Sequence, residues 1–315
     1  MGKFREPVCA IRRMSDVALV KLPVSLARCS ENHLSKASPV TCLAPLSAAS
    51  PVLKAPRAEG ALLLSAKWRG PATVIADLRQ QGSMKALFPR VRGDALQAVF
   101  LNTAGGLTGG DTMRIDATAE QDSHIVLSSQ AAERAYRAQP DQTAHVAVTL
   151  DVAAGGRVDW LPQETILFEG ARLERHLNVN LTGDAIALLV EPVIFGRAAM
   201  GEVLHDVHFT DQWRVRRDGA LVFADALRLT GDAQSQLVRP AIAGGAGAMA
   251  TVLLAAPHAA ACAKLDLPET CGASLIADDL LLVRLLAADG FALRRILVPL
   301  VEALSAAPIP RVWRL

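Results

Sequence analysis

An alternation of apolar and polar residues constrains the fold of this chain more than any other feature. It is clearest in residues 172–181, and a shorter copy occupies residues 143–150. Because successive side chains of a β-strand point to opposite faces, a period of two predicts a strand with one buried and one exposed face. The apolar positions are Leu173, Leu177, Val179 and Leu181 in the first segment and Val146, Val148 and Leu150 in the second.

Short turn signals separate segments of this kind. Within residues 213–223, the dipeptide Asp218-Gly219 predicts a hairpin turn, since Asp-Gly is favoured where both turn residues need a positive φ. No repeat of a strand followed by a long helix is visible, so the sequence predicts a mostly β domain. The other turns are expected at Gly155-Gly156, Gly183-Asp184 and Gly231-Asp232.

The C-terminal segment follows a different period. Apolar residues spaced three and four apart between Leu293 and Leu304 predict a helix, with Asp289 as its N-cap. Pro299 is expected to kink this helix, because proline lacks the N–H that bonds to the preceding turn.

Residues 240–263 carry no formal charge and are long enough to cross a membrane. Glycines crowd one end of this stretch, however, and Pro257 interrupts the other. We therefore expect a Gly-rich turn, a buried strand at 248–255 and a following helix, with no membrane association.

Charge is distributed unevenly along the chain. The formal net charge is +2, but residues 1–56 hold eight basic and three acidic residues, which leaves a net charge of −3 for residues 57–315. Residues 30–56 are also rich in Ser, Pro and Ala and show no periodicity. We predict a disordered or non-native extension at 1–56, a folded β domain at 57–315, and no nucleic-acid partner for this mildly acidic domain.

Cysteine usage indicates the compartment. The chain has 5 cysteines, which are widely spaced and form no CxxC pair, so neither a disulfide framework nor a zinc site is suggested. Residues 1–29 resemble a transit peptide only loosely and contain no apolar stretch of the signal-peptide type. We expect a reducing compartment and a cytoplasmic protein.

Two segments carry residues that a simple β domain does not need. The loop GGLTGG at 105–110 has neither the spacing of a dinucleotide-binding loop nor a following Gly-Lys-Ser/Thr, which favours a strand-connecting turn with close backbone approach. In WLPQETILFEGAR, residues 160–172, Glu164 and Glu169 interrupt an apolar run. Ionised carboxylates are costly to bury unless they are paired, hydrogen-bonded or bound to a cation.

Other candidate residues give weaker signals. Glu164 and Glu169 could be the paired carboxylates of a glycosidase, but an offset of five places them on opposite faces of a regular strand. Tyr136, the single tyrosine, is either a packing anchor for a loop or a contact in a partner interface. His205 and His208 would also lie on opposite strand faces and form no obvious metal pair. The remaining histidines of this group are expected to be surface or core residues: His124, His145 and His176.

These segments, in this order, resemble the UreD family of urease accessory proteins, called UreH in some bacteria. The chain departs from the family pattern at Thr103-Ala104, where prolines or glycine are usual, at Arg114, where an acid is common, and at Arg134, where lysine is common. The likeness runs from about residue 61 to the end of the chain. The matching pieces are GGLTGGD at 105–111, AAERAYR at 131–137, WLPQETILFEGAR at 160–172, FGRAAMGE at 195–202 and PRVWRL at 310–315.

The resemblance implies a β-helix-like, two-layered strand domain with a few helices. It also implies a role without catalysis, as a urease maturation chaperone. Such a protein binds the urease apoprotein and joins it to UreF, which in turn holds the GTPase UreG, the carrier of GTP and nickel. No cofactor would be bound stably, and nickel would pass in transit.

The resemblance also suggests residues for these roles. We expect weak, successive nickel contacts at Asp111, Glu164, Glu169 and Glu202, and a partner interface at Tyr136 and Arg137. Alternatively, these carboxylates cap turns or pair with Arg172 and Arg197. A second alternative is a β-helical carbohydrate-active hydrolase that uses Glu164 and Glu169.

Overall fold

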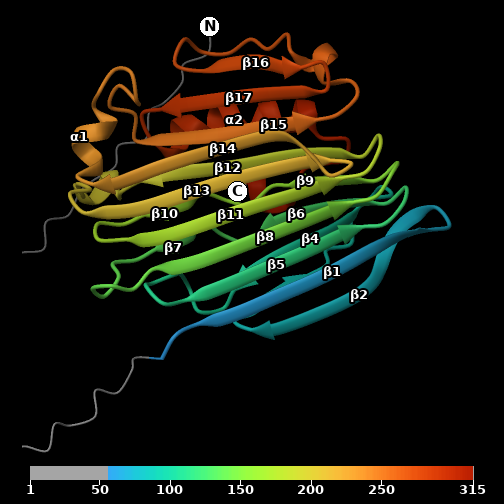
Figure 1. Ribbon diagram of the computed structural model, residues 1–315, viewed down its shortest axis with the longest axis horizontal. Coiled ribbons are helices and arrows are strands. Elements are labelled where there is room, and N and C mark those ends of the chain that lie inside the picture. Colours follow the sequence, from blue (N-terminus) through green and yellow to red (C-terminus); the bar gives the residue numbers. More distant parts are fainter. Residues whose placement is uncertain (1–55, 315) are drawn as a thin grey trace, which may run out of the picture. The chain divides into compact units, whose positions relative to one another are not determined.

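Two β-sheets packed face to face form the folded body in the computed structural model, which describes residues 56–314 (Figure 1). In the first sheet, the inner strands run parallel and an antiparallel strand closes each edge. This seven-stranded sheet has the spatial order β14 (Ala220–Gly231), β13 (Val207–Arg217), β11 (Arg172–Leu181), β8 (Ala144–Val152), β5 (Thr112–Ala119), β1 (Glu59–Arg69) and β2 (Ala72–Gly82).

The second sheet has ten strands among the same residues. Two of them, β7 (Glu133–Ala135) and β10 (Thr165–Leu167), are short: β10 pairs with β12 and with β7. The other strands follow the order β16 (Gly272–Ala277), β17 (Leu280–Ala287), β15 (Ala248–Ala255), β12 (Ile186–Phe195), β9 (Arg157–Trp160), β6 (His124–Ser129), β4 (Leu96–Asn102) and β3 (Met84–Leu87).

The chain alternates between the two sheets in successive coils. It passes from β4 to β5, back to β6, and then through β8, β9, β11, β12 and β13 in the same way. Strands of neighbouring coils therefore stack in parallel within each sheet. This winding confirms the expected β-helix-like, two-layered strand fold.

The period-two pattern places the main core between the sheets. In β11, the predicted inward residues Leu173, Leu177, Val179 and Leu181 are all buried, as is Arg175 in the same phase, whereas the residues of the opposite phase are more exposed. The same alternation holds along β13, where Val207, Phe209, Trp213 and Val215 point inward. Apolar side chains of both sheets meet there in one cluster, so the alternation in the sequence is the signature of a sheet with one covered face.

A second core lies between the ten-stranded sheet and helix α2 (Gly290–Leu304). Figure 1 shows α2 on the far side of β15 and β17. The carboxylate of Asp289 accepts a hydrogen bond from the N–H of Ala292 at 2.7 Å, which confirms the predicted N-cap, and the helix continues past Pro299. The buried face of the helix consists of Leu293, Leu297, Leu300, Val301 and Leu304.

The uncharged stretch at 240–263 forms a central strand. Its residues 248–255 are β15, which lies between β12 and β17, and a short 3₁₀ helix, η2 (Ala259–Cys262), follows where a helix was expected. No helix of residues 56–314 combines the length and apolar character needed to span a membrane.

The other short helices are η1 (Ala198–Met200), α1 (Ala233–Leu237) and η3 (Arg311–Arg314). The prediction for residues 1–56 falls almost entirely outside the described residues.

Candidate functional site

Four of the sequence motifs meet at one end of the coiled sheets. The N–H of Leu107 donates to the carbonyl of Arg134 at 2.7 Å, and the N–H of Phe168 donates to the carbonyl of Ala135 at 3.0 Å. The N–H of Gly170 then donates to the carbonyl of Asp206 at 2.9 Å. Neighbouring coils thus stack these loops on one another. We call this region the motif end; it comprises residues 102–111, 130–142, 161–171 and 195–206 and lies on the side of Figure 1 that carries β7 and β10.

The glycine loop is a tight connection between the two sheets. It joins β4 to β5, and Gly106 has a φ of 152°. A Cβ atom at Gly106 would lie 2.3 Å from Cε2 of Tyr136, and one at Gly109 would lie 2.4 Å from the carbonyl oxygen of Gln142. Only glycine fits such approaches. The loop is therefore a strand-connecting turn with close backbone contact, as the sequence predicted.

Asp111 ends this loop and fixes it to the first strand. Its Oδ1 accepts a hydrogen bond from the N–H of Ala58, and its Oδ2 accepts one from the N–H of Thr108, both at 2.8 Å. The carboxylate is buried. Both of its oxygens thus bond to backbone donors of the loop and of the segment before β1.

Glu169 and Glu202 are brought together at the motif end. The N–H of Glu169 donates to Oε1 of Glu202 at 3.2 Å, while Oε2 of Glu169 accepts from the N–H of His205 at 2.7 Å. Arg197 donates to both oxygens of Glu202, at 2.8 and 2.9 Å. These hydrogen bonds from Arg197 lower the pKa of Glu202 to about 2. The pairing with Arg197 is the arrangement that the sequence left open as an alternative to metal contact.

Glu164 occupies a different place. It is buried, and its Oε1 accepts a hydrogen bond from Arg294 of α2 at 2.8 Å. The same Arg294 nitrogen also donates to the side-chain oxygen of Gln163 at 2.7 Å. Glu164 and Glu169 share no hydrogen-bond partner among residues 56–314, because Glu164 bonds to α2 and Glu169 bonds to the loop before β13.

Tyr136 and Arg137 lie at the surface of the motif end. Tyr136 packs edge-to-face on Phe168 with 5.0 Å between ring centroids, yet 37% of it stays exposed. Arg137 is exposed, with its guanidinium 3.8 Å from Glu169. Two further exposed apolar residues of the same end are Met200 and Val203. Tyr136 therefore anchors its loop and still offers one side of its ring to a partner.

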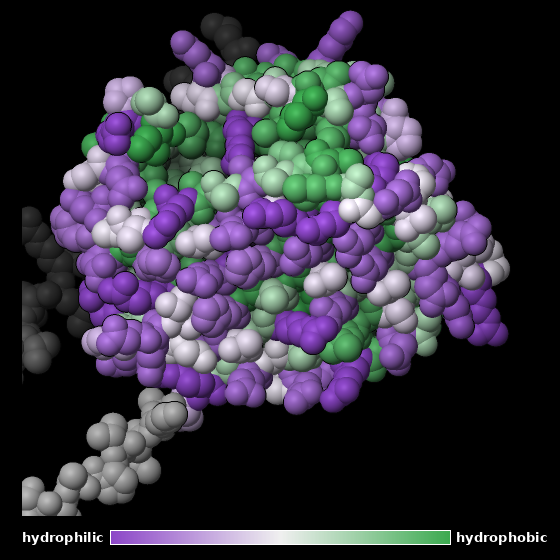
Figure 2. Space-filling view, in the orientation of Figure 1, coloured by the Kyte–Doolittle hydropathy of each residue, from purple (hydrophilic) through white to green (hydrophobic). Residues whose placement is uncertain are grey.

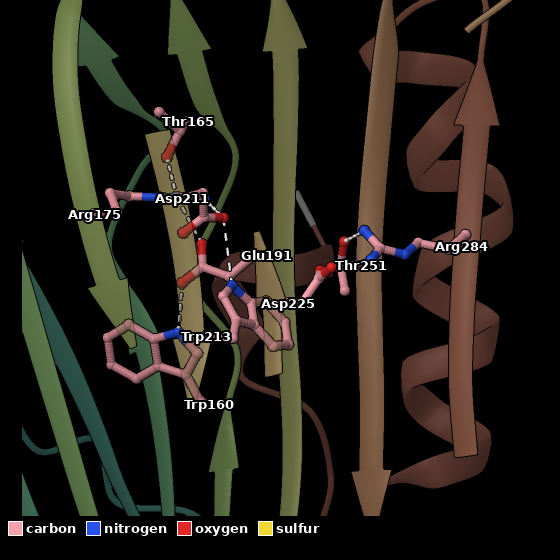
Figure 3. Close-up of polar contacts among 9 residues, drawn as sticks. All are labelled: Trp160, Thr165, Arg175, Glu191, Asp211, Trp213, Asp225, Thr251 and Arg284. Atoms are coloured by element: carbon pink, nitrogen blue, oxygen red, sulfur yellow. Dashed lines mark hydrogen bonds and ion pairs between the residues drawn. The ribbon is translucent and has the colours of Figure 1, made fainter. Parts of the chain in front are cut away.

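A buried ionic cluster lies between the sheets, and the sequence analysis did not single it out (Figure 3). Arg175 of β11 donates to Glu191 of β12 at 2.7 Å and to Asp211 of β13 at 2.6 Å. Indole N–H groups complete the shell: Trp160 donates to Glu191 at 2.8 Å, and Trp213 to Asp211 at 3.3 Å. One cation thus faces two carboxylates inside an apolar core.

The sequence did contain a signal for this cluster. Arg175 has the same phase as the inward residues Leu173 and Leu177, and Asp211 has the same phase as Phe209 and Trp213. A charged residue at an inward position of an alternating strand must find a partner in the core. Burial raises the pKa of Glu191 to about 7, although the neighbouring Arg175 acts against this rise.

A cavity of about 70 Å³ adjoins the cluster. Arg175, Glu191, Asp211 and Gln163 line it together with apolar side chains of both sheets. The Nε of Arg175 and the Nε2 of Gln163 are buried and have no hydrogen-bond partner among residues 56–314. Because buried polar groups are nearly always hydrogen-bonded, these two donors favour a polar occupant of the cavity, such as water.

Glu133 stands between this cavity and the surface. It lines the cavity and also a surface pocket of about 240 Å³ at the motif end, formed by residues of 100–105 and 129–134. Burial raises the pKa of Glu133 to about 7, and a hydrogen bond from Asn102 opposes the rise. Within residues 56–314, no three His, Cys, Asp or Glu side chains form a ready-made metal site.

The comparisons with known proteins agree on one family. A family model described as "UreD urease accessory protein" matches residues 58–314. A protein named "Urease accessory protein UreD" from Ruegeria pomeroyi is 47% identical over 253 residues, which cover 79% of this chain and 98% of that protein. "Urease accessory protein UreD 3" from Bradyrhizobium sp. strain BTAi1 is 41% identical over 273 residues, which cover 85% of this chain and 98% of that protein.

Proposed function

Because the chain belongs to the UreD family of urease accessory proteins, we propose that it serves urease maturation as a chaperone without catalytic activity of its own. In this proposal it binds the urease apoprotein together with UreF and the GTPase UreG. It gives nickel, released from UreG, a path toward the urease active site. Nickel is cargo here, and the protein holds no cofactor of its own.

The observation that carries the proposal is that Glu133 lines both a surface pocket and an internal cavity, and that Glu191 and Asp211 also line this cavity. Carboxylate oxygens attract a divalent cation, and imperfect sites release it again. The unpartnered donors of Arg175 and Gln163 support a wet interior, and bound water would keep part of the hydration shell of the ion in place. Such a route suits transfer better than storage.

The carboxylates of the motifs belong to the same proposal. Asp111, Glu169 and Glu202 would contact nickel at the motif end, and Glu164 would do so where α2 meets the ten-stranded sheet. Each of them now bonds to protein donors. Nickel would therefore have to displace these donors from the carboxylates, which favours brief contacts over tight binding.

The test is co-purification followed by a urease assay. The tagged full-length chain is expressed with UreF, UreG and the urease subunits, with and without nickel. We expect a stable complex and nickel-dependent urease activity. Retention of none of these partners would overturn the maturation role, and active urease in the absence of the chain would do so as well.

Carboxylate variants test the nickel route separately. Glu133→Gln removes the ionisable group at the pocket but keeps the shape of the side chain, and we expect several-fold lower urease activation with the complex intact. The double variant Glu164→Ala with Glu169→Ala is expected to act in the same direction. Glu120→Gln, an exposed carboxylate in the turn after β5, is the control. Full activation by both test variants would contradict the route while leaving the chaperone role standing.

The proposed partner interface at Tyr136 and Arg137 has a matched control in the chain. We expect Tyr136→Ala with Arg137→Ala to weaken retention of urease or UreF, because an exposed aromatic ring and an arginine are favoured interface contacts. Trp68 and Arg69 form a similar exposed pair at the other end of the strands, and their double alanine variant should bind as the unchanged chain does. Equal binding by both double variants would exclude this interface.

A further inference from the structure

The loop that follows β12 raises an apolar side chain at the motif end. Met200, the last residue of η1, is 74% exposed. Its neighbours along the chain are small: Ala198, Ala199 and Gly201. Because none of these neighbours has a side chain larger than a methyl group, a partner surface can approach the methionine from several sides.

Hydrogen bonds hold this loop in one conformation. Arg197 donates to both oxygens of Glu202 through its guanidinium, and its backbone N–H donates to Oε2 of the same carboxylate at 3.0 Å. The N–H of Met200 donates to the carbonyl of Arg197 at 2.8 Å. Gly201 has a φ of 64°, a conformation that glycine adopts at little cost. The methionine is therefore presented on a preformed loop.

Aromatic packing joins this loop to the neighbouring loop of the motif end. The guanidinium of Arg197 lies over the ring of Phe168, 4.2 Å from its centroid, and Phe168 packs on Tyr136. Two further arginines border the surface. The side chain of Arg137 is 66% exposed, and the exposed Arg134 makes no salt bridge within residues 56–314. The exposed methionine thus stands on a surface whose border is basic.

We propose that Met200 inserts into an apolar pocket of a protein partner, and that carboxylates border this pocket. An unbranched thioether side chain adapts to an irregular pocket. A side chain on a preformed loop also loses little conformational entropy on binding. Arg134 and Arg137 supply the charge that such a border complements. The inference rests on the proposed function, since the partner is one of the urease maturation proteins or urease itself.

The position of Met200 distinguishes this contact from one on the broad face of the molecule. Figure 2 shows the outer face of the seven-stranded sheet, which is largely hydrophilic. Met200 instead lies at the end of the strands, and the surface pocket that Glu133 lines lies at the same end. A partner that accepts the methionine would therefore contact the end where the proposed nickel route opens.

The experiment measures how fast each partner leaves the complex. The tagged full-length chain is co-expressed with UreF, UreG and the urease subunits, the complex is immobilised, and dissociation is followed. We expect Met200→Gln to speed the dissociation of one partner at least about tenfold, or to abolish its retention. Met200→Leu keeps the volume and the apolar character, so it should behave as the unchanged chain does. Leu221→Gln is the matched control, since Leu221 is 54% exposed and lies beside the hairpin turn at the other end of the strands.

Salt tests the acidic border of the pocket. Dissociation of the same partner should quicken as salt rises, and Arg134→Gln should reduce this dependence. Dissociation that does not respond to salt would overturn the acidic border. Equal dissociation from the unchanged chain and from Met200→Gln would overturn the insertion and leave the proposed function standing, as would equal effects of Met200→Leu and Met200→Gln. Retention of no partner by the unchanged chain would overturn both.

Discussion

Replacing Arg175 with methionine is expected to lower the free energy of unfolding by about 3–5 kcal/mol. The variant would leave Glu191 and Asp211 buried without their cation, since both carboxylates bond to Arg175. The measurement is urea denaturation followed by tryptophan fluorescence, to which Trp160 and Trp213 report directly because their indoles bond to the same carboxylates.

Arg172→Met is the matched control for that experiment. Arg172 lies on the same strand but points outward, and its partner Asp206 is 54% exposed. Exposed ion pairs contribute about 1 kcal/mol or less, so this variant should stay close to the unchanged chain. A loss of stability in Arg175→Met no larger than in Arg172→Met would show that the buried cluster is dispensable for folding.

Glu133→Gln is expected to change how stability depends on pH. The pKa of Glu133 is raised from 4.5 to about 7, chiefly by burial. A carboxyl with a raised folded-state pKa contributes stability that is complete below the unfolded value, and it loses that contribution as pH rises to the folded value. Between pH 4.5 and 7 the unchanged chain should therefore lose up to about 3 kcal/mol through this residue, whereas the glutamine variant should not lose that share.

The measurement is a series of denaturation curves between pH 5 and 8. Glu191 also has a raised pKa, so the variant should keep part of the slope and become less steep than the unchanged chain. Glu120→Gln, which alters an exposed carboxylate, should leave the slope as it is. Parallel pH profiles for the unchanged chain and Glu133→Gln would mean that Glu133 ionises freely in the folded protein.

The sequence alone was sufficient to predict several of the strands and to indicate the family. The alternation in residues 172–181 predicts β11 and its buried face, and the three- and four-residue spacing after Asp289 predicts α2 with its cap. Both patterns depend on neighbours along the chain. The motifs are also contiguous segments of the sequence, which is why they indicate the UreD family without knowledge of the tertiary structure.

Contacts between coils could not be predicted from such local sequence patterns. The sequence suggested that carboxylates of the motifs contact nickel. In the structure, Asp111 and Glu169 accept hydrogen bonds from backbone N–H groups and thereby fix loops. Glu133 lies in the polar stretch QAAERAYRA, and nothing there predicted its burial beside an internal cavity. His145 and His208 looked isolated in the sequence, yet the structure places them on either side of Glu174.

Local sequence therefore determined which residues form strands and which side of each strand is buried. Tertiary structure decided which charged groups meet: Arg175 with Glu191 and Asp211, Glu164 with Arg294, and Glu202 with Arg197. The physical reason is the register of the stacked coils. Period-two alternation is a property of a single strand, whereas the partner of an inward or outward charge depends on how neighbouring coils are aligned, and the alternation within one strand carries no information about that alignment.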